Sequence, residues 1–284
     1  MEQAALILEG GANRGIFTAG VLDFLMDQDF RASYVVGVSA GACNALGYVS
    51  EQRGRTRDCI LAQNEEKDKL EEMKRAARTR SLFDMDQLFD RFPNGEIPFD
   101  YGTYFSSPIE CELVLTNCRT GRAEYRQERQ DRKRLMDLCR ASCSVPVGTP
   151  MVEIGGTPYL DGGLADSIPI VRAMDKGWRK NIVVLTRNAG YRKKPPHAAR
   201  ALYQAAYTKY PELLKTLLKR ARMYNRTLAA IEKWEREGRI FVIRPQMKAI
   251  GRLESDPRLL EAFYRDGYEQ ICRQYEALQT YLQK

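Results

Sequence analysis

Ser39 lies in the stretch Gly37-Val38-Ser39-Ala40-Gly41, whose GxSxG spacing is that of a nucleophile elbow. In such an elbow a serine occupies a strained turn between a strand and a helix, and small neighbours relieve the crowding. The residues before Ser39 are apolar and β-branched, and those after it are small. The sequence therefore predicts a nucleophilic serine at a strand-to-helix turn, with the Ala40 amide placed to donate to an oxyanion.

A second glycine-rich stretch, Gly10-Gly11-Ala12-Asn13-Arg14-Gly15, separates an expected strand at 4–8 from an expected helix. Consecutive glycines allow backbone N–H groups to turn toward one point, and the helix N-terminus adds positive potential there. This arrangement suits a phosphate or a developing oxyanion. The Walker and GxGxxG phosphate patterns do not fit these residues. Taken alone, the stretch is also compatible with a purely structural turn.

The base that would deprotonate Ser39 is the open question of this sequence. The chain has one histidine, His197, which follows two prolines in a basic stretch. It has the chain order of an α/β-hydrolase, but that fold places several strands before its nucleophile, and here only one strand precedes Ser39. The alternative is Asp161, which ends an apolar run and precedes Gly162-Gly163. Asp166, five residues later, is its rival, and composition does not choose between the two carboxylates.

The elements expected around these residues form an α/β fold. Apolar runs at 4–8, 33–39, 111–117, 181–187 and 239–245 predict buried strands, and the first two flank a helical pattern. This order indicates parallel βαβ units and a doubly wound, mostly parallel sheet flanked by helices. The carboxyl ends of parallel strands share one edge, so the Gly10–Gly15 loop is expected to face Ser39.

Two regions along the chain are distinguished by composition. Residues 1–190 carry the expected catalytic core. Residues 191–284 contain a basic helical segment, one further strand and an amphipathic C-terminal helix beginning near Asp256 and Pro257. We expect this second region to pack on the core as an extension of it, without forming an independent domain.

The composition also bounds the function classes. The start of the chain has no signal-peptide pattern, and there is no apolar run of about 18 residues. The seven cysteines form no CxxC pair, which favours reduced thiols and a cytoplasmic location. With a single histidine and no cysteine cluster in the sequence, a zinc site is not expected.

The positive charge of the chain is local. Arg187 to Arg226 contain eleven Lys or Arg residues and one acid, Glu212, whereas the whole chain has a net charge of +8. Residues 211–226 place leucines on one helical face and basic residues on the other. This pattern predicts either a helix docked on the core with a solvated basic side, or peripheral contact with an anionic membrane surface. No nucleic-acid-binding module is present, so no nucleic-acid partner is expected.

The three motifs together resemble the patatin-like phospholipases, which are acyl hydrolases with a Ser–Asp dyad. The family combines a glycine-rich oxyanion loop, a GxSxG elbow and a DG[GA] motif in this order. They match Gly10–Gly15, Gly37–Gly41 and Asp161-Gly162-Gly163. Residues 141–150, the first helix and the C-terminal tail are also similar to the bacterial branch of the family, so the resemblance covers nearly the whole chain.

The resemblance implies an esterase of lipids, of phospholipase A or lysophospholipase type. Ser39 would be the nucleophile, Asp161 the general base and acid, and the amides of Gly11 and Ala12 the oxyanion donors, with Arg14 steadying the loop. No metal or organic cofactor is required. Ala12 departs from the family, which usually has glycine there, so a positive φ at Ala12 would be strained. A thioesterase or acyltransferase, and a non-catalytic lipid-binding protein, remain the alternatives.

Overall fold

The computed structural model describes residues 1–64, 69–81, 83–195 and 198–284. Within these ranges eight strands form one sheet in the order β5-β6-β3-β2-β1-β7-β8, and β4 also pairs with β3. The strands are β1 (Glu2–Leu8), β2 (Ala32–Val38), β3 (Glu110–Asn117), β4 (Ala123–Arg126), β5 (Val152–Ile154), β6 (Thr157–Asp161), β7 (Lys180–Val184) and β8 (Phe241–Ile243).

The sheet is parallel at its centre and antiparallel at one side. β3, β2, β1, β7 and β8 pair in parallel, whereas β4 and β6 run antiparallel to β3 and β5 runs antiparallel to β6. The predicted α/β fold with a mostly parallel sheet is confirmed. β4 and β5 were not predicted, because they are short, half exposed and without an apolar run.

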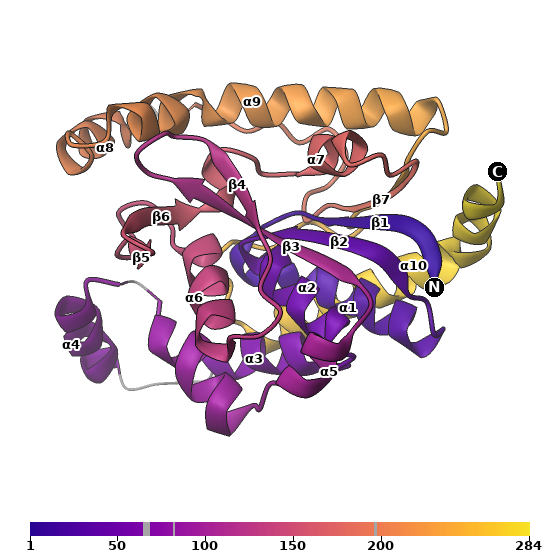
Figure 1. Ribbon diagram of the computed structural model, residues 1–284, viewed down its shortest axis with the longest axis horizontal. Coiled ribbons are helices and arrows are strands. Elements are labelled where there is room, and N and C mark those ends of the chain that lie inside the picture. Colours follow the sequence, from indigo (N-terminus) through magenta and orange to yellow (C-terminus); the bar gives the residue numbers. More distant parts are fainter. Residues whose placement is uncertain (65–68, 82, 196–197) are drawn as a thin grey trace.

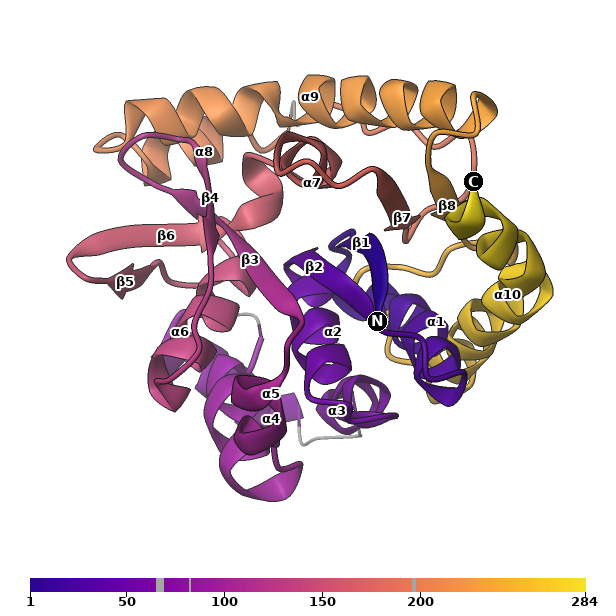
Figure 2. The same ribbon diagram turned by 45° about the vertical axis from the view of Figure 1, so that its right-hand side comes forward.

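Helices cover both faces of the sheet (Figures 1 and 2). One face carries α1, α2 and α10, and the other carries α7 and α9. The helices are α1 (Gly15–Asp27), α2 (Ala40–Val49), α3 (Arg55–Gln63), α4 (Lys69–Thr79), α5 (Tyr101–Ser106), α6 (Arg132–Cys143), α7 (Ile170–Asp175), α8 (Arg200–Ala206), α9 (Pro211–Arg236) and α10 (Pro257–Gln283). Short 3₁₀ turns η1 (Ala12–Arg14) and η3 (Gly162–Leu164) and the π-helical η2 (Gln87–Glu96) complete the set.

The region after residue 190 lies against the core on two sides. β8 extends the sheet beside β7, and α10 crosses α1 at close range (Figure 2). A Cβ on Gly267 would lie 2.1 Å from the Phe17 carbonyl oxygen, and one on Gly20 would lie 2.1 Å from the Tyr264 carbonyl oxygen. Two glycines, one on each helix, therefore allow the backbones of α1 and α10 to touch.

We expect Gly267→Ala to lower the free energy of unfolding by about 3 kcal/mol, the upper end of the range for overpacking. The added methyl group meets backbone, which cannot rotate away, so the two helices must separate. Chemical denaturation measures the change. Gly95→Ala is the control, because a Cβ there has no neighbour within 4 Å; an equal loss in both variants would contradict the close-packing explanation.

The predicted amphipathic basic helix is confirmed as part of α9. Its apolar side is buried against the sheet and against β6, through Leu213, Leu217, Ala221, Leu228 and Ile231. Lys215, Lys219, Arg222 and Arg226 are exposed on the opposite side. None of the helices in the described ranges is both long enough and apolar enough to span a membrane.

Candidate active site

Ser39 occupies the turn between β2 and α2, as predicted. Its backbone has φ 56° and ψ −127°, a left-handed conformation that is unfavourable for a side chain larger than glycine. The glycine-rich loop after β1 lies directly against this turn, since a Cβ on Gly10 would be 2.8 Å from the Val38 carbonyl oxygen. Gly37 and Gly41 also touch, and a Cβ on Gly37 would be 2.2 Å from the Gly41 carbonyl oxygen. The small residues of the GxSxG stretch thus make room for a strained serine.

The strained turn is held by a side chain that the sequence did not single out for this role. The Ser39 N–H donates to Ser142 Oγ (2.9 Å), and the Ser142 hydroxyl donates to the Val114 carbonyl oxygen (2.7 Å). Ser142 is fully buried at the end of α6. It belongs to the 141–150 stretch that carries part of the family resemblance, which was the one available signal for it.

Asp161 ends β6 and is 4 % exposed. Its Oδ1 accepts the Gly163 N–H (2.7 Å), its own N–H donates to the Ser144 carbonyl oxygen (2.7 Å), and its carbonyl oxygen accepts the Thr116 hydroxyl (2.8 Å). Gly162 is packed against β3, where a Cβ would lie 2.0 Å from the Val114 carbonyl oxygen. Backbone contacts therefore fix the position of this carboxylate.

The strand register brings Ser39 and Asp161 to the two sides of β3. Val38, the residue before Ser39, pairs with Val114, and Asp161 pairs with the next residue, Leu115. The two backbones are therefore about two strand spacings apart, roughly 10 Å. Ser39 and Asp161 both line one cavity of about 550 Å³.

The backbone N–H groups of the glycine-rich loop have different uses. The Asn13 N–H donates to the Arg252 carbonyl oxygen, the Arg14 N–H to Gly11, and the Gly15 N–H to Ala12 and Asn13. Within the described part of the chain no acceptor is found for the N–H groups of Gly11, Ala12 and Ala40. Gly10, Gly11 and Ala12 line the cavity, whereas Asn13 and Gly15 do not. The N–H groups of Asn13, Arg14 and Gly15 already have acceptors, so these three residues are less suited as oxyanion donors than the sequence suggested.

Ala12 and Arg14 are the two residues of the glycine-rich loop for which the sequence raised specific expectations, a strained φ and a supporting side chain. Ala12 has φ 50°, so the strain expected for a residue other than glycine is present. The Arg14 side chain is 3 % exposed and lines the cavity, and its Nε and Nη1 have no hydrogen-bond partner among the residues described. These two buried nitrogens therefore bind no carbonyl oxygen of the loop among the described residues.

Asp166, the rival carboxylate, does not line this cavity. Asp166 Oδ2 accepts the Tyr125 hydroxyl (2.8 Å), and Asp166 is not a lining residue. Burial raises the pKa of Asp166, and the bond from Tyr125 opposes that shift. His197 lies outside the described residues.

Ser39 stands where the cavity meets a second, apolar pocket. The pocket has a volume of about 90 Å³ and shares Ala12, Ser39, Phe83 and Val145 with the cavity. Most of its remaining lining is apolar side chains and cysteines from α2, α3, α6 and the start of η2. They are Cys43, Cys59, Ile60, Met85, Leu88, Phe89 and Cys143. One side of Ser39 is therefore lined mainly by apolar side chains, whereas the cavity on the other side combines apolar with charged side chains.

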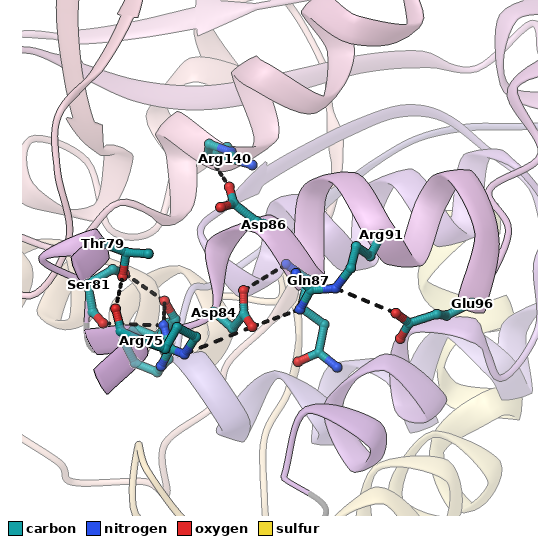
Figure 3. A network of polar contacts seen from close by, with 10 residues as sticks. Arg75, Thr79, Ser81, Asp84, Asp86, Gln87, Arg91, Glu96 and Arg140 are labelled. Atoms are coloured by element: carbon teal, nitrogen blue, oxygen red, sulfur yellow. Dashed lines mark hydrogen bonds and ion pairs between the residues drawn. The ribbon is translucent and has the colours of Figure 1, made fainter. Parts of the chain in front are cut away.

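A charged network holds the outer wall of the apolar pocket (Figure 3). The Arg75 guanidinium donates to the carbonyl oxygen of Phe83 (3.0 Å), and Asp84 accepts from the Gln87 N–H (2.9 Å) and from Arg91 (2.8 Å). Nearby, Arg140 on α6 pairs with Asp86 at 2.7 Å. These contacts tie residues 83–91, which carry the apolar lining, to α4 and α6.

The lining of the large cavity contains more basic than acidic side chains. Five of its lining residues are basic and two are acidic: Arg14, Arg187, Lys193, Arg220 and Arg252, with Glu9 and Asp161. Burial first, and then the charge of Arg187, lowers the pKa of Arg14 to about 10. Burial also lowers the pKa of Arg220, which Asp161 opposes and Arg252 reinforces. The cations are therefore only partly compensated by the carboxylates around them.

The surroundings of Lys193 strongly disfavour its charged form. Its Nζ lies 4.0 Å from the centre of the Tyr224 ring, and Asn225 holds its backbone through two hydrogen bonds of 2.8 and 3.0 Å. Burial, followed by the charges of Arg220 and Arg252, lowers its pKa to about 6, although Glu9 and Asp161 act in the opposite direction. Lys193 is thus placed where a positive charge is unfavourable.

We expect Lys193→Met to stabilise the fold at pH 7 by at least about 1 kcal/mol, since one pKa unit corresponds to about 1.4 kcal/mol. Between the folded pKa of about 6 and the ordinary value of 10.5, the unfolded chain binds a proton that the folded chain does not. Wild-type stability therefore rises with pH in this window, and the advantage of the variant shrinks toward pH 10. Unfolding curves of the wild type and of Lys193→Met at pH 7 and pH 10 measure the difference in the free energy of unfolding. The same difference at both pH values would contradict this prediction.

The structure also gathers three cysteines. Cys43 Sγ on α2 lies 3.7 Å from Cys139 Sγ and 3.7 Å from Cys143 Sγ, both on α6. Thiol hydrogen bonds from these two hold the pKa of Cys43 well below its ordinary value. No sign of this group is visible in the sequence, because Cys43 is separated from Cys139 and Cys143 by 96 and 100 positions and no spacing motif results.

Both the region before residue 190 and the region after it match known protein families. The family model of patatin-like phospholipases matches residues 6–174, and a model described as a domain of unknown function (DUF6363) matches residues 210–283. The uncharacterized protein YjjU of Escherichia coli (strain K12) is 30% identical over 195 residues, which are 64% of this chain and 51% of YjjU. The chain thus spans about half the length of this curated relative. The crystal structure of VipD from Legionella pneumophila is similar over 99% of this chain and 67% of that chain, with a TM-score of 0.47 and 15% identity.

Proposed function

Because the chain belongs to the patatin-like phospholipase family, a family of lipid acyl hydrolases, we propose that it hydrolyses carboxylic esters of lipids with Ser39 as nucleophile and Asp161 as base. The observation that carries this proposal is the placement of both residues in one cavity, with Ser39 on a left-handed strand-to-helix turn and Asp161 fixed by backbone contacts. The uncommitted N–H groups of Gly11, Ala12 and Ala40 beside Ser39 support it.

The reaction runs in two halves. Ser39 Oγ attacks the ester carbonyl carbon while its proton passes to an Asp161 carboxylate oxygen, and the Gly11, Ala12 and Ala40 N–H groups donate hydrogen bonds to the developing oxyanion. The tetrahedral intermediate collapses, the C–O bond to the alcohol breaks, and Asp161 protonates the leaving oxygen. A water then attacks the acyl-enzyme, gives its proton to Asp161, and releases the fatty acid as Ser39 regains its proton. No step requires a metal or an organic cofactor.

We also propose that residues 1–190 and 191–284 act as one unit, and that the exposed basic side of α9 contacts anionic membrane surfaces. Lys215, Lys219, Arg222 and Arg226 face outward, where they would meet lipid head groups, and Lys215 is also paired with Glu212 at 2.6 Å. Arg187, Lys193 and Arg220, which belong to the same basic segment, line the cavity. The basic segment therefore contributes side chains both to the cavity and to the outer surface, and only those on the outer surface are available to a membrane.

Hydrolysis of p-nitrophenyl butyrate and covalent labelling by a fluorophosphonate test the proposed activity. We expect turnover by the purified chain and one phosphonyl group on Ser39, located by mass spectrometry, because both reactions need only an activated serine and an oxyanion site. Liposomes and acyl-coenzyme A thioesters then distinguish a lipid esterase from a thioesterase. Absence of both turnover and label would favour a non-catalytic lipid-binding protein.

A further inference from the structure

We propose that Cys43, Cys139 and Cys143 bind one zinc ion at the wall of the apolar pocket beside Ser39. The three Sγ atoms all lie within 4.8 Å of one another. No zinc site was expected from the sequence, because these cysteines form no spacing motif. The proposed hydrolysis makes no use of the three thiols, and the zinc site does not depend on that activity.

The first argument is the spacing of the sulfur atoms. Cys43 Sγ lies 3.7 Å from the Sγ atoms of both Cys139 and Cys143. Two sulfur atoms bound at about 2.3 Å to one tetrahedral zinc ion are about 3.8 Å apart. These pairs of sulfurs therefore already have nearly the separation that a shared zinc ion requires. A disulfide would use only two of the three thiols, whereas a metal ion uses all of them.

The second argument is the placement of the ligands on two helices that are held together. Cys139 and Cys143 are four residues apart on α6, so they share one face of that helix, the spacing at which a helix presents two ligands to one ion. Cys43 comes from α2. The Ser142 hydroxyl accepts the Ser39 N–H (2.9 Å) and so holds the end of α6 against the start of α2. The packing of the two helices thus positions all three ligands.

The third argument is access to the site. Cys43 and Cys143 are half-buried and line the apolar pocket, whereas Cys139 is buried. The pocket has a volume of about 90 Å³, which is more than the room that one water molecule needs. An ion can therefore enter from the pocket, and a water molecule on that side can complete a tetrahedron of three thiolates and one oxygen.

The charge of the site favours a divalent ion that prefers sulfur. On binding, the thiol protons pass to solvent and sulfur–zinc bonds replace them. Three thiolates and Zn²⁺ leave one net negative charge, whereas a monovalent copper ion would leave two in the same apolar surroundings. Arg55 on α3, whose positive charge favours the Cys43 thiolate, partly offsets the remaining charge. Magnesium and calcium prefer oxygen ligands and are not suited to this group.

Zinc titration of the reduced, chelator-stripped full chain, in competition with a chromophoric chelator, tests the site. We expect one Zn²⁺ per chain with a Kd below about 10⁻⁷ M, the weak end of the range for structural zinc sites. Cys139→Ser should weaken binding by about a hundredfold or more, because even groups that only support a ligand contribute about 10- to 100-fold. Cys59→Ser is the matched control and should keep the wild-type affinity, since Cys59 lines the same pocket but is not one of the three clustered sulfurs.

Cobalt identifies the ligands in the wild type itself, so the test does not depend on the folding of Cys139→Ser. Co²⁺ in the site should give thiolate-to-cobalt charge-transfer absorption in the near ultraviolet, with the intensity of three thiolates, and the strong visible bands of tetrahedral geometry. Zinc should displace this signal. A weak octahedral spectrum without charge transfer would overturn the assignment of the three sulfurs.

Thermal unfolding reports the structural effect of the ion, which would join α2 to α6. Free zinc at about 100 times the Kd should raise the Tm of the wild type by about 5 °C. The Tm of Cys139→Ser should not rise at the same zinc concentration. An equal rise in both proteins would show that zinc acts at another place and would overturn the site.

Three further outcomes would overturn the proposal. They are a wild type that takes no zinc from the chelator, a Cys139→Ser variant that binds zinc as tightly as the wild type, and an equal loss of affinity in Cys59→Ser. Hydrogen peroxide tests the rival use of the group, because it oxidises two thiols to a disulfide and is itself reduced to two water molecules. Bound zinc should protect Cys43 from this oxidation; equal formation of a Cys43 disulfide with and without zinc would identify a redox pair instead.

Discussion

Ser39→Ala is expected to lower kcat for p-nitrophenyl butyrate by about 10⁴-fold or more, the scale seen when a serine nucleophile is removed. The covalent intermediate cannot form without the Ser39 hydroxyl, although the cavity and the oxyanion donors remain. The fold should not change, because alanine tolerates the φ of 56° about as well as serine does and the Ser39 N–H keeps its bond to Ser142. Initial rates measured in excess substrate, with fluorophosphonate labelling of the same variant, give the result.

Ser167→Ala is the matched control for this loss. Ser167 also lines the cavity, but its hydroxyl donates to the Gly163 carbonyl oxygen (2.6 Å) and is therefore engaged with the backbone. Its replacement should cost less than about tenfold in rate, the effect of a peripheral hydrogen bond. A comparable collapse of activity in both variants, or persistent labelling of Ser39→Ala, would place the nucleophile elsewhere.

Asp161→Asn is expected to lower kcat by about 10²–10⁴-fold, the contribution of a general base. The amide has nearly the same shape, and its oxygen can still accept the Gly163 N–H, so stability should change little. KM should also change little, because the loss occurs at proton transfer and leaves substrate binding intact. Steady-state kinetics together with a thermal unfolding curve separate a chemical defect from a folding defect.

Two further variants complete the assignment of the base. Asp166→Asn should keep most of the activity, because Asp166 is bound to Tyr125 and does not line the cavity. His197→Ala should also remain active if Asp161 is the base. Loss of activity in His197→Ala together with survival of Asp161→Asn would contradict the dyad and indicate a histidine-dependent mechanism.

The sequence alone determined the features that depend on neighbouring residues. The turn at Ser39 requires small residues next to it, and Gly37, Ala40 and Gly41 are visible in the printed chain. The parallel strands β1 and β2 follow from two apolar runs separated by one helix, and the parallel pairing puts their carboxyl ends together. The basic helix of the extension, α9, was likewise predictable, because its apolar and basic residues alternate with helical period. Each of these features arises from residues close together in the chain, where backbone geometry and side-chain periodicity dominate.

Only the tertiary structure decided which side chains from distant parts of the chain line the cavity around Ser39. The basic segment appeared uniform in sequence, yet Arg220 turns into the cavity while Arg222, two residues away on α9, is exposed. Arg252 gave no signal at all, since a lone arginine in a loop has no pattern. The contacts of Ser142 and of the three cysteines were equally unpredictable from the sequence, because their partners lie on other elements. Such contacts are set by the packing of α6, α9 and α10 around one sheet, and no local spacing encodes which side chains that packing brings together.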